Sequence, residues 1–285
     1  ADCLYYLNKI PNHIKFDLII ADPPYNIGKN FGNNSDNKSL YEYVEWSNFW
    51  IKKCLNLLKE DGLIYIYGFP EILAHVSINF PLENQKWLVW HYTNKTVPSL
   101  KFWQRSHETI LCLWANKRPK IEINRIREPY TESYKKCIGR KRKNTKGRFG
   151  VKETIYNGHK NGALPRDVIK IPSLAGGKGS VERYFLCHTC NSKLFPPSQI
   201  EQHRTHKILK HPTQKPMSLT KKLILSRIKN KKGNLLIPFA GSGSECVLAK
   251  FMRINYLGIE INPEYAFFAK SWLERGLDEE LTKRI

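Results

Sequence analysis

FDLIIADPPYN, residues 16–26, combines a buried strand with a rigid turn. Residues 16–20 are apolar apart from one Asp, a pattern typical of a buried strand. The two prolines that follow lack an N–H and restrict φ, so they end the strand in a stiff loop. This loop holds the Asp22 carboxylate, the carbonyls of Pro23 and Pro24, and the Tyr25 ring in a fixed relation. Such a loop suits a site that grips a planar ring bearing an amine; an ordinary strand-to-loop turn is the alternative.

Strand and helix patterns alternate around this stretch. Asp2 is placed to cap a short helix within residues 1–11, where Leu4, Leu7 and Ile10 share one face. Further segments predict a long amphipathic helix over 40–59, ended by Asp61-Gly62, and strands over 63–67, 86–92 and 108–114. The alternation predicts a parallel sheet with right-handed crossovers.

The alternation stops between about residues 116 and 210 and then returns. The later segments predict helices over 217–228, with Pro216 at the first helical position, 244–252 and 263–273, and strands over 233–238 and 255–261. We therefore expect an α/β fold with a doubly wound, mixed but mostly parallel sheet. A basic recognition region is inserted in it.

The charge of the chain is strongly positive and unevenly distributed. The formal net charge is +22, and residues 117–170 hold 17 Lys and Arg against 5 Asp and Glu. More than half of the net charge therefore lies in less than a fifth of the chain. A solvated basic face is the general alternative, but clustering in one segment favours a surface that tracks phosphates.

Cysteine usage and hydropathy indicate the compartment. Seven scattered cysteines suit a reducing cytosol better than a disulfide framework. No run of about eighteen apolar residues appears, and no signal peptide is recognisable. We expect a cytoplasmic protein that does not enter a membrane.

A second strand end carries a glycine turn. Gly241 and Gly243 in FAGSG let a ligand approach the backbone at the start of a helix, and Glu260 closes the next strand, where it can accept from ribose hydroxyls. The third glycine of a dinucleotide fingerprint and a phosphate-loop Lys are missing, which disfavours a di- or triphosphate. Because ligands bind beyond the carboxyl ends of such strands, Asp22 and Gly241 predict one site with two ligands.

ADPPYN, HPTQKP and FAGSG, in this order, resemble the beta class of amino DNA methyltransferases, which use S-adenosylmethionine. NKTVPS followed by SHETILCLW is also similar to that class. The resemblance implies a catalytic half over residues 1–115, a target-recognition region over 116–210 and a cofactor-binding half over 211–285. It places Thr213 and Lys215 near the cofactor tail and Asp2 near the cofactor adenine.

The resemblance carries over residue by residue. The implied catalytic residues are Asp22, Pro23, Pro24 and Tyr25, and the implied cofactor-binding residues are Asp2, Cys3, His211, Thr213, Lys215, Phe239, Ala240, Gly241, Ser242, Gly243, Glu260 and Asn262. Within the family an aspartate in the motif favours adenine N6, whereas serine more often goes with cytosine N4. The expected activity is site-specific methylation of adenine in duplex DNA with the base flipped out, as in restriction–modification.

Other functions stay open on the sequence. They are cytosine-N4 methylation, methylation of RNA, and a non-catalytic zinc-dependent nucleic-acid-binding protein. The candidate partners are duplex DNA, a cognate restriction endonuclease and a second copy of the chain.

One feature departs from the family pattern. Cys187-x2-Cys190 is followed after twelve residues by His203, and after two more by His206. The first gap suits a zinc finger and the second is one residue short, with His188 and His211 as alternative ligands. Two free thiols and exposed histidines are the competing interpretation. We expect a structural zinc ion at Cys187, Cys190, His203 and His206.

Overall fold

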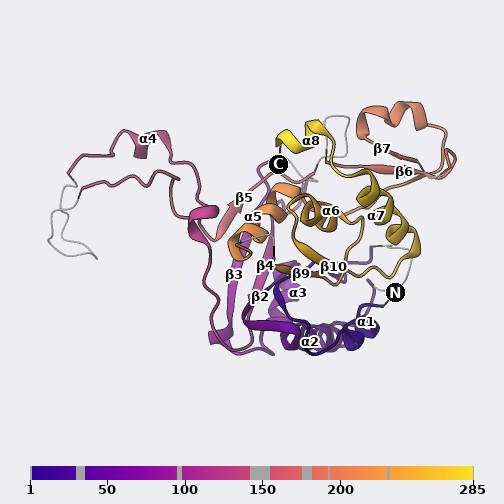
Figure 1. The fold of residues 1–285 in the computed structure, drawn as a ribbon, viewed down its shortest axis with the longest axis horizontal. Helices are drawn as coiled ribbons and strands as arrows, with labels where there is room; N and C mark the ends of the chain where they lie inside the picture. The colour runs from indigo at the N-terminus through magenta and orange to yellow at the C-terminus, as the bar shows by residue number, and fades with distance from the viewer. Residues whose placement is uncertain are drawn as a thin grey trace.

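The computed structural model describes residues 2–29, 36–94, 98–141, 155–174, 182–191, 193–229 and 232–284. Within them a seven-stranded sheet has the order β10-β9-β1-β2-β4-β3-β5 (Figure 1). Its strands are β1 (Phe16–Ala21), β2 (Leu58–Gly68), β3 (Gln85–His91), β4 (His107–Leu113), β5 (Val168–Lys170), β9 (Asn234–Ile237) and β10 (Asn255–Gly258). β1 runs parallel to β2 and β9, β9 to β10, and β3 to β5, whereas β4 is antiparallel to β2 and β3. The predicted mixed, mostly parallel sheet is confirmed.

Helices cover both faces of this sheet. On one face lie α1 (Cys3–Lys9), α2 (Leu40–Leu57) and α3 (Pro70–Ser77); on the other lie α5 (Met217–Arg227), α6 (Ser244–Phe251) and α7 (Pro263–Arg275), and α8 (Glu279–Arg284) follows (Figure 1). Alternate β1 side chains supply the two cores. Ile19 packs with Trp50 of α2, and Leu18 packs with Leu223 of α5. This alternation is the period-2 pattern of a strand buried on both faces.

The end of α2 differs from the prediction. Ser39 and Glu42 form a capping box at its start, as its sequence favours. The helix ends at Leu57, and β2 begins at once, so Asp61 and Gly62 lie within the strand. The pairing of β2 with β1 shifts register at this point, because Phe16 pairs with Leu58 but Leu18 pairs with Leu63. Asp61 and Gly62 lie in the unpaired residues of β2 between these two pairs. A turn-like dipeptide here forms a bulge instead of a helix stop.

Smaller differences occur at other boundaries. Pro216 is the N-cap residue of α5, one position before the predicted one, and β10 ends at Gly258. Pro263 begins α7 as predicted, after an Asn262 side chain that accepts from the N–H groups of Glu264 and Tyr265. The two short helices α3 and α8 were not predicted.

An arm, defined here as residues 116–141 and 155–167, projects from the sheet after β4 (Figure 1). It passes through η2 (Ile123–Arg125) and α4 (Glu132–Lys135) and returns to β5. Bridges between Glu128 and Ala163 and between Lys141 and Ile155 hold its two limbs together. The most basic run, residues 135–150, is described only as far as Lys141. The Asn- and Gly-rich sequence of residues 28–37 favours a loop that could close over a substrate, and this segment also lies largely outside the described residues.

A second, small sheet has the order β7-β6-β8. It consists of β6 (Phe185–Cys187), β7 (Lys193–Phe195) and β8 (Ile208–Leu209), with η3 (Pro197–His203) between β7 and β8. Figure 1 shows it beside α7, at the opposite end of the molecule from the arm. None of the helices in the described part of the chain combines the length and the apolar character needed to span a bilayer.

Candidate active site

A cavity of about 200 Å³ lies where the loops after β1 and β9 leave the sheet. The two strands are parallel neighbours, with Leu18 opposite Leu235, so their carboxyl ends reach the same edge. Asp22, Pro23 and Pro24 line the cavity from the first loop, and residues 238–242 line it from the second. The predicted meeting of the two loops at one site therefore occurs, as expected at a switch point of an α/β sheet.

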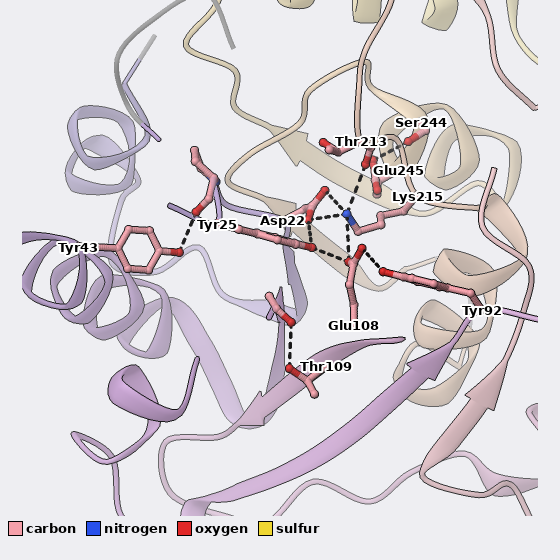
Figure 2. Close-up of polar contacts among 12 residues, drawn as sticks. Asp22, Tyr25, Tyr43, Tyr92, Glu108, Thr109, Thr213, Lys215, Ser244 and Glu245 are labelled. Atoms are coloured by element: carbon pink, nitrogen blue, oxygen red, sulfur yellow. Dashed lines mark hydrogen bonds and ion pairs between the residues drawn. The ribbon is translucent and has the colours of Figure 1, made fainter. Parts of the chain in front are cut away.

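Asp22 is paired with a buried lysine (Figure 2). The Lys215 Nζ lies 2.8 Å from Asp22 Oδ1 and 2.9 Å from Oδ2. The Lys215 side chain is 2% exposed and that of Asp22 15%, so the carboxylate is screened from solvent but still faces the cavity. Nζ also donates to the Thr213 carbonyl at 3.3 Å and lies 3.5 Å from Glu108 Oε2. Lys215 thus links the loop after β1 with the segment that leads into α5.

The Tyr25 hydroxyl lies between the carboxyl groups of Asp22 and Glu108. The Tyr25 Oη lies 2.8 Å from Asp22 Oδ1 and 2.7 Å from Glu108 Oε2, and Tyr92 donates to Glu108 Oε1 at 2.7 Å (Figure 2). Tyr25 has one hydroxyl hydrogen and can donate to one acceptor at a time. Its ring is buried and meets Phe69 edge to face at 5.2 Å between centroids. Tyr25 therefore orients Asp22.

Burial dominates the electrostatics of this cluster. Burial raises the pKa of Asp22; Lys215 opposes this rise and Glu108 adds to it. Burial disfavours the Lys215 ammonium, but Asp22 and Glu108 outweigh it and raise the pKa of Lys215. Burial also raises the pKa of Glu245 to about 7, although a hydrogen bond from Ser244 opposes this rise. The site therefore holds more carboxyl groups than cations, which suits a cationic ligand.

Glu260 fixes the glycine turn on the other side of the cavity. Its Oε2 accepts from the Gly241 N–H at 2.7 Å, and Oε1 accepts from the Asn262 N–H at 2.8 Å. Gly241 has φ +52°, and a Cβ there would lie 2.7 Å from His211 Nε2. Burial and the nearby Lys215 lower the pKa of His211 to about 3, so a neutral imidazole forms this wall. Only glycine fits between the backbone and this ring.

Most of the predicted site residues line the cavity. They are Asp2, Cys3, Asp22, Pro23, Pro24, His211, Thr213, Lys215, Phe239, Ala240, Gly241, Ser242 and Glu260. Tyr25, Gly243 and Asn262 are not among the lining residues. Gly243 has φ +80° at the start of α6, where a Cβ would lie 2.6 Å from the Ala269 Cβ. Gly243 therefore allows a close contact between α6 and α7 and is not part of the cavity wall.

Sequence reasoning missed Glu108, Glu245, Trp46 and Tyr92. Glu108 is the second residue of β4, and the start of a strand in a parallel sheet lies away from the ligand edge. Because β4 is antiparallel to β2, Thr109 pairs with Gly68 at the end of β2, and Glu108 contacts Tyr25 and Lys215, the partners of Asp22. An acid beside a predicted strand is a usable signal only when the direction of that strand is known.

The four predicted metal ligands also meet. The ligand atoms of Cys187, Cys190, His203 and His206 all lie within 4.8 Å of one another. The alternative ligands lie elsewhere: His188 Nε2 is 3.6 Å from Glu264 Oε1, and His211 lines the cavity.

These features define a class. An α/β sheet with a glycine turn, an acid at the end of the next strand and a buried Asp–Lys pair at the switch point is the arrangement of an enzyme that binds a nucleoside cofactor. The chain belongs to the DNA methylase family, because the family model N6_N4_Mtase matches residues 16–271. It is a DNA methyltransferase, as the three ordered motifs indicate.

The sequences of known methyltransferases match this chain over nearly its whole length. The Type II methyltransferase M.HpaI of Haemophilus parainfluenzae is 28% identical over 90% of this chain and 68% of the relative. The DNA adenine methyltransferase YhdJ of Escherichia coli is 28% identical over 93% of this chain and 78% of the relative.

Solved structures share the fold. The M1.HpyAVI–SAM complex matches with a TM-score of 0.53 and 20% identity, over 95% of this chain and 96% of that one. The PvuII DNA methyltransferase, described as cytosine-N4-specific, matches with a TM-score of 0.63 and 16% identity, over 99% of this chain and 88% of that one.

Proposed function

We propose that this protein transfers a methyl group from S-adenosylmethionine to the exocyclic N6 of adenine in duplex DNA. The observation that carries the proposal is the Asp22 carboxylate, which is fixed by Lys215 and Tyr25 yet still lines the cavity. An aspartate at this position of the motif favours adenine by resemblance. The E. coli relative named a DNA adenine methyltransferase supports the same target.

The cavity residues fit the cofactor. Glu260 lines the cavity at the end of the strand that follows the glycine turn, where its carboxylate is placed to accept from ribose hydroxyls. Phe239, Ile259 and Ile261 supply apolar walls for a base. When bound, S-adenosylmethionine supplies an electrophilic methyl group on a cationic sulfur, which retains the electron pair of the broken bond as a neutral thioether. The acidic cluster around Asp22 favours that cation.

The target amine needs help because its lone pair is conjugated with the ring. Asp22 and the Pro23 carbonyl are placed to accept its two hydrogens, which draws the nitrogen toward a tetrahedral form and exposes the lone pair. Holding the amine in this orientation supplies much of the rate. A nitrogen that has gained a methyl group holds one proton too many. Asp22, whose pKa is raised by burial, is placed to remove it.

The reacting atom of a base is inaccessible inside a duplex, so the adenine must leave the stack. The positive charge of residues 117–170 provides contacts to the phosphates of the flanking DNA. The relative M.HpaI is named a Type II methyltransferase, and we propose a restriction–modification role with a cognate endonuclease as the functional partner.

Product analysis tests the proposal. DNA methylated by the purified protein is digested to nucleosides and examined by mass spectrometry. We expect N6-methyladenine that depends on added S-adenosylmethionine and is lost in Asp22→Asn. N4-methylcytosine as the product would reject the adenine assignment. Preferential methylation of RNA in competition with duplex DNA would reject the DNA substrate.

A further inference from the structure

Four metal-binding side chains converge at one end of the small sheet. The Cys190 Sγ lies 3.3 Å from His206 Nδ1 and 3.8 Å from His203 Nδ1, and the Cys187 Sγ lies 3.5 Å from His206 Nδ1. The two Nδ1 atoms are 3.2 Å apart. Cys187 and His203 are buried, and Cys190 and His206 are half-buried. The cluster is therefore closed on its inner side.

These separations are the edges of a zinc tetrahedron. Zn–S bonds of about 2.3 Å and Zn–N bonds of about 2.05 Å place S and N about 3.6 Å apart and two N atoms about 3.3 Å apart. The distances in the cluster match both values within about 0.3 Å. Each imidazole turns one nitrogen, Nδ1, toward the centre that the two sulfur atoms also face. Coordination of one ion requires such a common centre, with one donor atom from each residue.

The surrounding unit is too small to be held by its own core. Its cluster contains Phe185, Cys187 and Phe195 as fully buried members, with Cys190, Ile200 and Ile208 against them. The Phe195 ring stacks on His203 at 3.9 Å between centroids, which fixes the orientation of that ligand. Leu186 and Leu194 of the small sheet belong to the core of the main sheet instead, so this cluster alone orders the metal-binding side, and a metal ion adds to that order.

We propose that Cys187, Cys190, His203 and His206 bind one structural zinc ion. The two thiolates and two neutral imidazoles complete a four-coordinate site with no open position, so the ion does not take part in methyl transfer.

The unit built on this ion supports the cofactor cavity. The Arg183 guanidinium donates to the carbonyls of His211 and Pro212, both at 3.0 Å. The Glu182 carbonyl accepts from the Gln214 amide at 2.7 Å, and its carboxylate accepts from the Met217 N–H at 2.7 Å. The ion thereby fixes the segment that leads to Lys215. This part of the inference rests on the proposed function.

Metal analysis of protein purified without a polyhistidine tag tests the site. We expect one zinc per chain, lost in Cys187→Ser and His206→Asn. Two matched controls should keep it: Cys137→Ser, in the arm, and His188→Asn, whose ring faces Glu264. His206→Cys should also keep the ion, because a thiolate replaces the imidazole as a ligand. Cobalt substitution should give the visible absorption of a tetrahedral thiolate site.

Folded wild-type protein without stoichiometric zinc would overturn the proposal. Zinc retained in both Cys187→Ser and His206→Asn would do the same. If both ligand variants fail to fold, His206→Cys with full zinc content supports the site, and a folded His206→Cys without zinc rejects it.

Cofactor affinity tests the support role. Calorimetry on chelator-treated and untreated protein should show S-adenosylmethionine binding weakened roughly tenfold, within the usual range of coupling between sites. Unchanged affinity after zinc loss rejects the support role and leaves the metal site standing. Wild-type, zinc-loaded protein that does not bind S-adenosylmethionine would instead reject the proposed function.

Discussion

The Lys215 Nζ lies 2.8 Å from Asp22 Oδ1, although the two residues are 193 positions apart in the chain. The ammonium is the cation that faces both Asp22 and Glu108. Because the Lys215 side chain is 2% exposed, solvent cannot replace it as the partner of these carboxyl groups. One contact between segments far apart in the chain therefore opposes the rise that burial causes in the pKa of Asp22.

Removal of this cation should be costly. In Lys215→Met the carboxyl groups of Asp22 and Glu108 stay buried without their ion partner, which costs about 3–5 kcal/mol of the free energy of unfolding. Urea unfolding at pH 8 measures this loss. Lys222→Met is the matched control, because Lys222 pairs with Glu128 where the side chains are 20% and 26% exposed. Its expected loss is about 1 kcal/mol or less. Equal losses in the two variants would contradict the role of Lys215.

Asp22→Asn should separate catalysis from cofactor binding. The amide keeps the size of the side chain but is a weaker acceptor and cannot take up the proton. Single-turnover methyl transfer should fall about 10²–10⁴-fold, the usual contribution of a catalytic base. Binding of S-adenosylmethionine, measured by calorimetry, should persist.

Asp17→Asn is the control for this substitution. Asp17 stands at the other end of β1, where it accepts from Lys59 Nζ and from the Asn234 N–H, both at 2.8 Å. The Asp17→Asn variant should transfer methyl groups at nearly the wild-type rate. A similar rate loss in both variants would indicate damage to β1 rather than loss of the acceptor.

Gly241→Ala should weaken cofactor binding. The new Cβ would meet His211 Nε2 at 2.7 Å in a backbone conformation with φ +52°, so the loop or the ring must move into the cavity. We expect at least a tenfold loss of S-adenosylmethionine affinity by calorimetry, equivalent to about 1.4 kcal/mol. Gly276→Ala also places a Cβ at a positive φ, +76°, but with no atom within 4 Å of it. It should leave affinity unchanged, and equal effects would show that strain alone is responsible.

Neutralising Arg140, Lys141, Arg142 and Lys143 together should weaken binding to every DNA sequence. Each lost phosphate contact should lower the slope of log K against log salt by about 0.9. Arg142 and Lys143 lie outside the described residues, so the number of contacts comes from the measured slope.

Lys52 and Lys53 of α2, on the body of the protein, provide the control pair. Their neutralisation should leave the slope unchanged. If the slope of log K against log salt is also unchanged in the arm variant, the four neutralised basic residues do not contact phosphates and form a solvated surface.

The two strand ends that form the cavity could be predicted from the local sequence pattern and from the general topology of α/β sheets. Asp22 and Gly241 each follow an apolar strand with a recognisable break, and parallel strands bring such ends to one edge. The Cys–His spacing likewise identified four side chains that the fold brings within 4.8 Å of one another. In each case the signal lies within a short segment.

Other parts of the site depend on long-range pairing. Glu108 reaches Tyr25 and Lys215 only because β4 is antiparallel, and no local pattern encodes that direction. Val168–Lys170 joins the main sheet beside β3 through three residues, too few for a period-2 pattern. Asp61 and Gly62 have the composition of a turn, yet their pairing partner in β1 draws them into a bulge. Tertiary contacts outweigh local preference at these positions.

Glu245→Gln should change how stability depends on pH. Burial raises the pKa of Glu245 from 4.5 to about 7, so between these values the folded state binds more protons than the unfolded state. Stability from this group is complete below about pH 4.5 and is lost as the pH rises through 7. Since Gln stays neutral, the variant should gain up to about 3 kcal/mol over the wild type between pH 4 and pH 8, by urea unfolding. Glu42→Gln should show the opposite trend, because hydrogen bonds from Ser39 lower the pKa of Glu42. A Glu245→Gln difference that is constant with pH would mean that this carboxyl has the same pKa in the folded and the unfolded state.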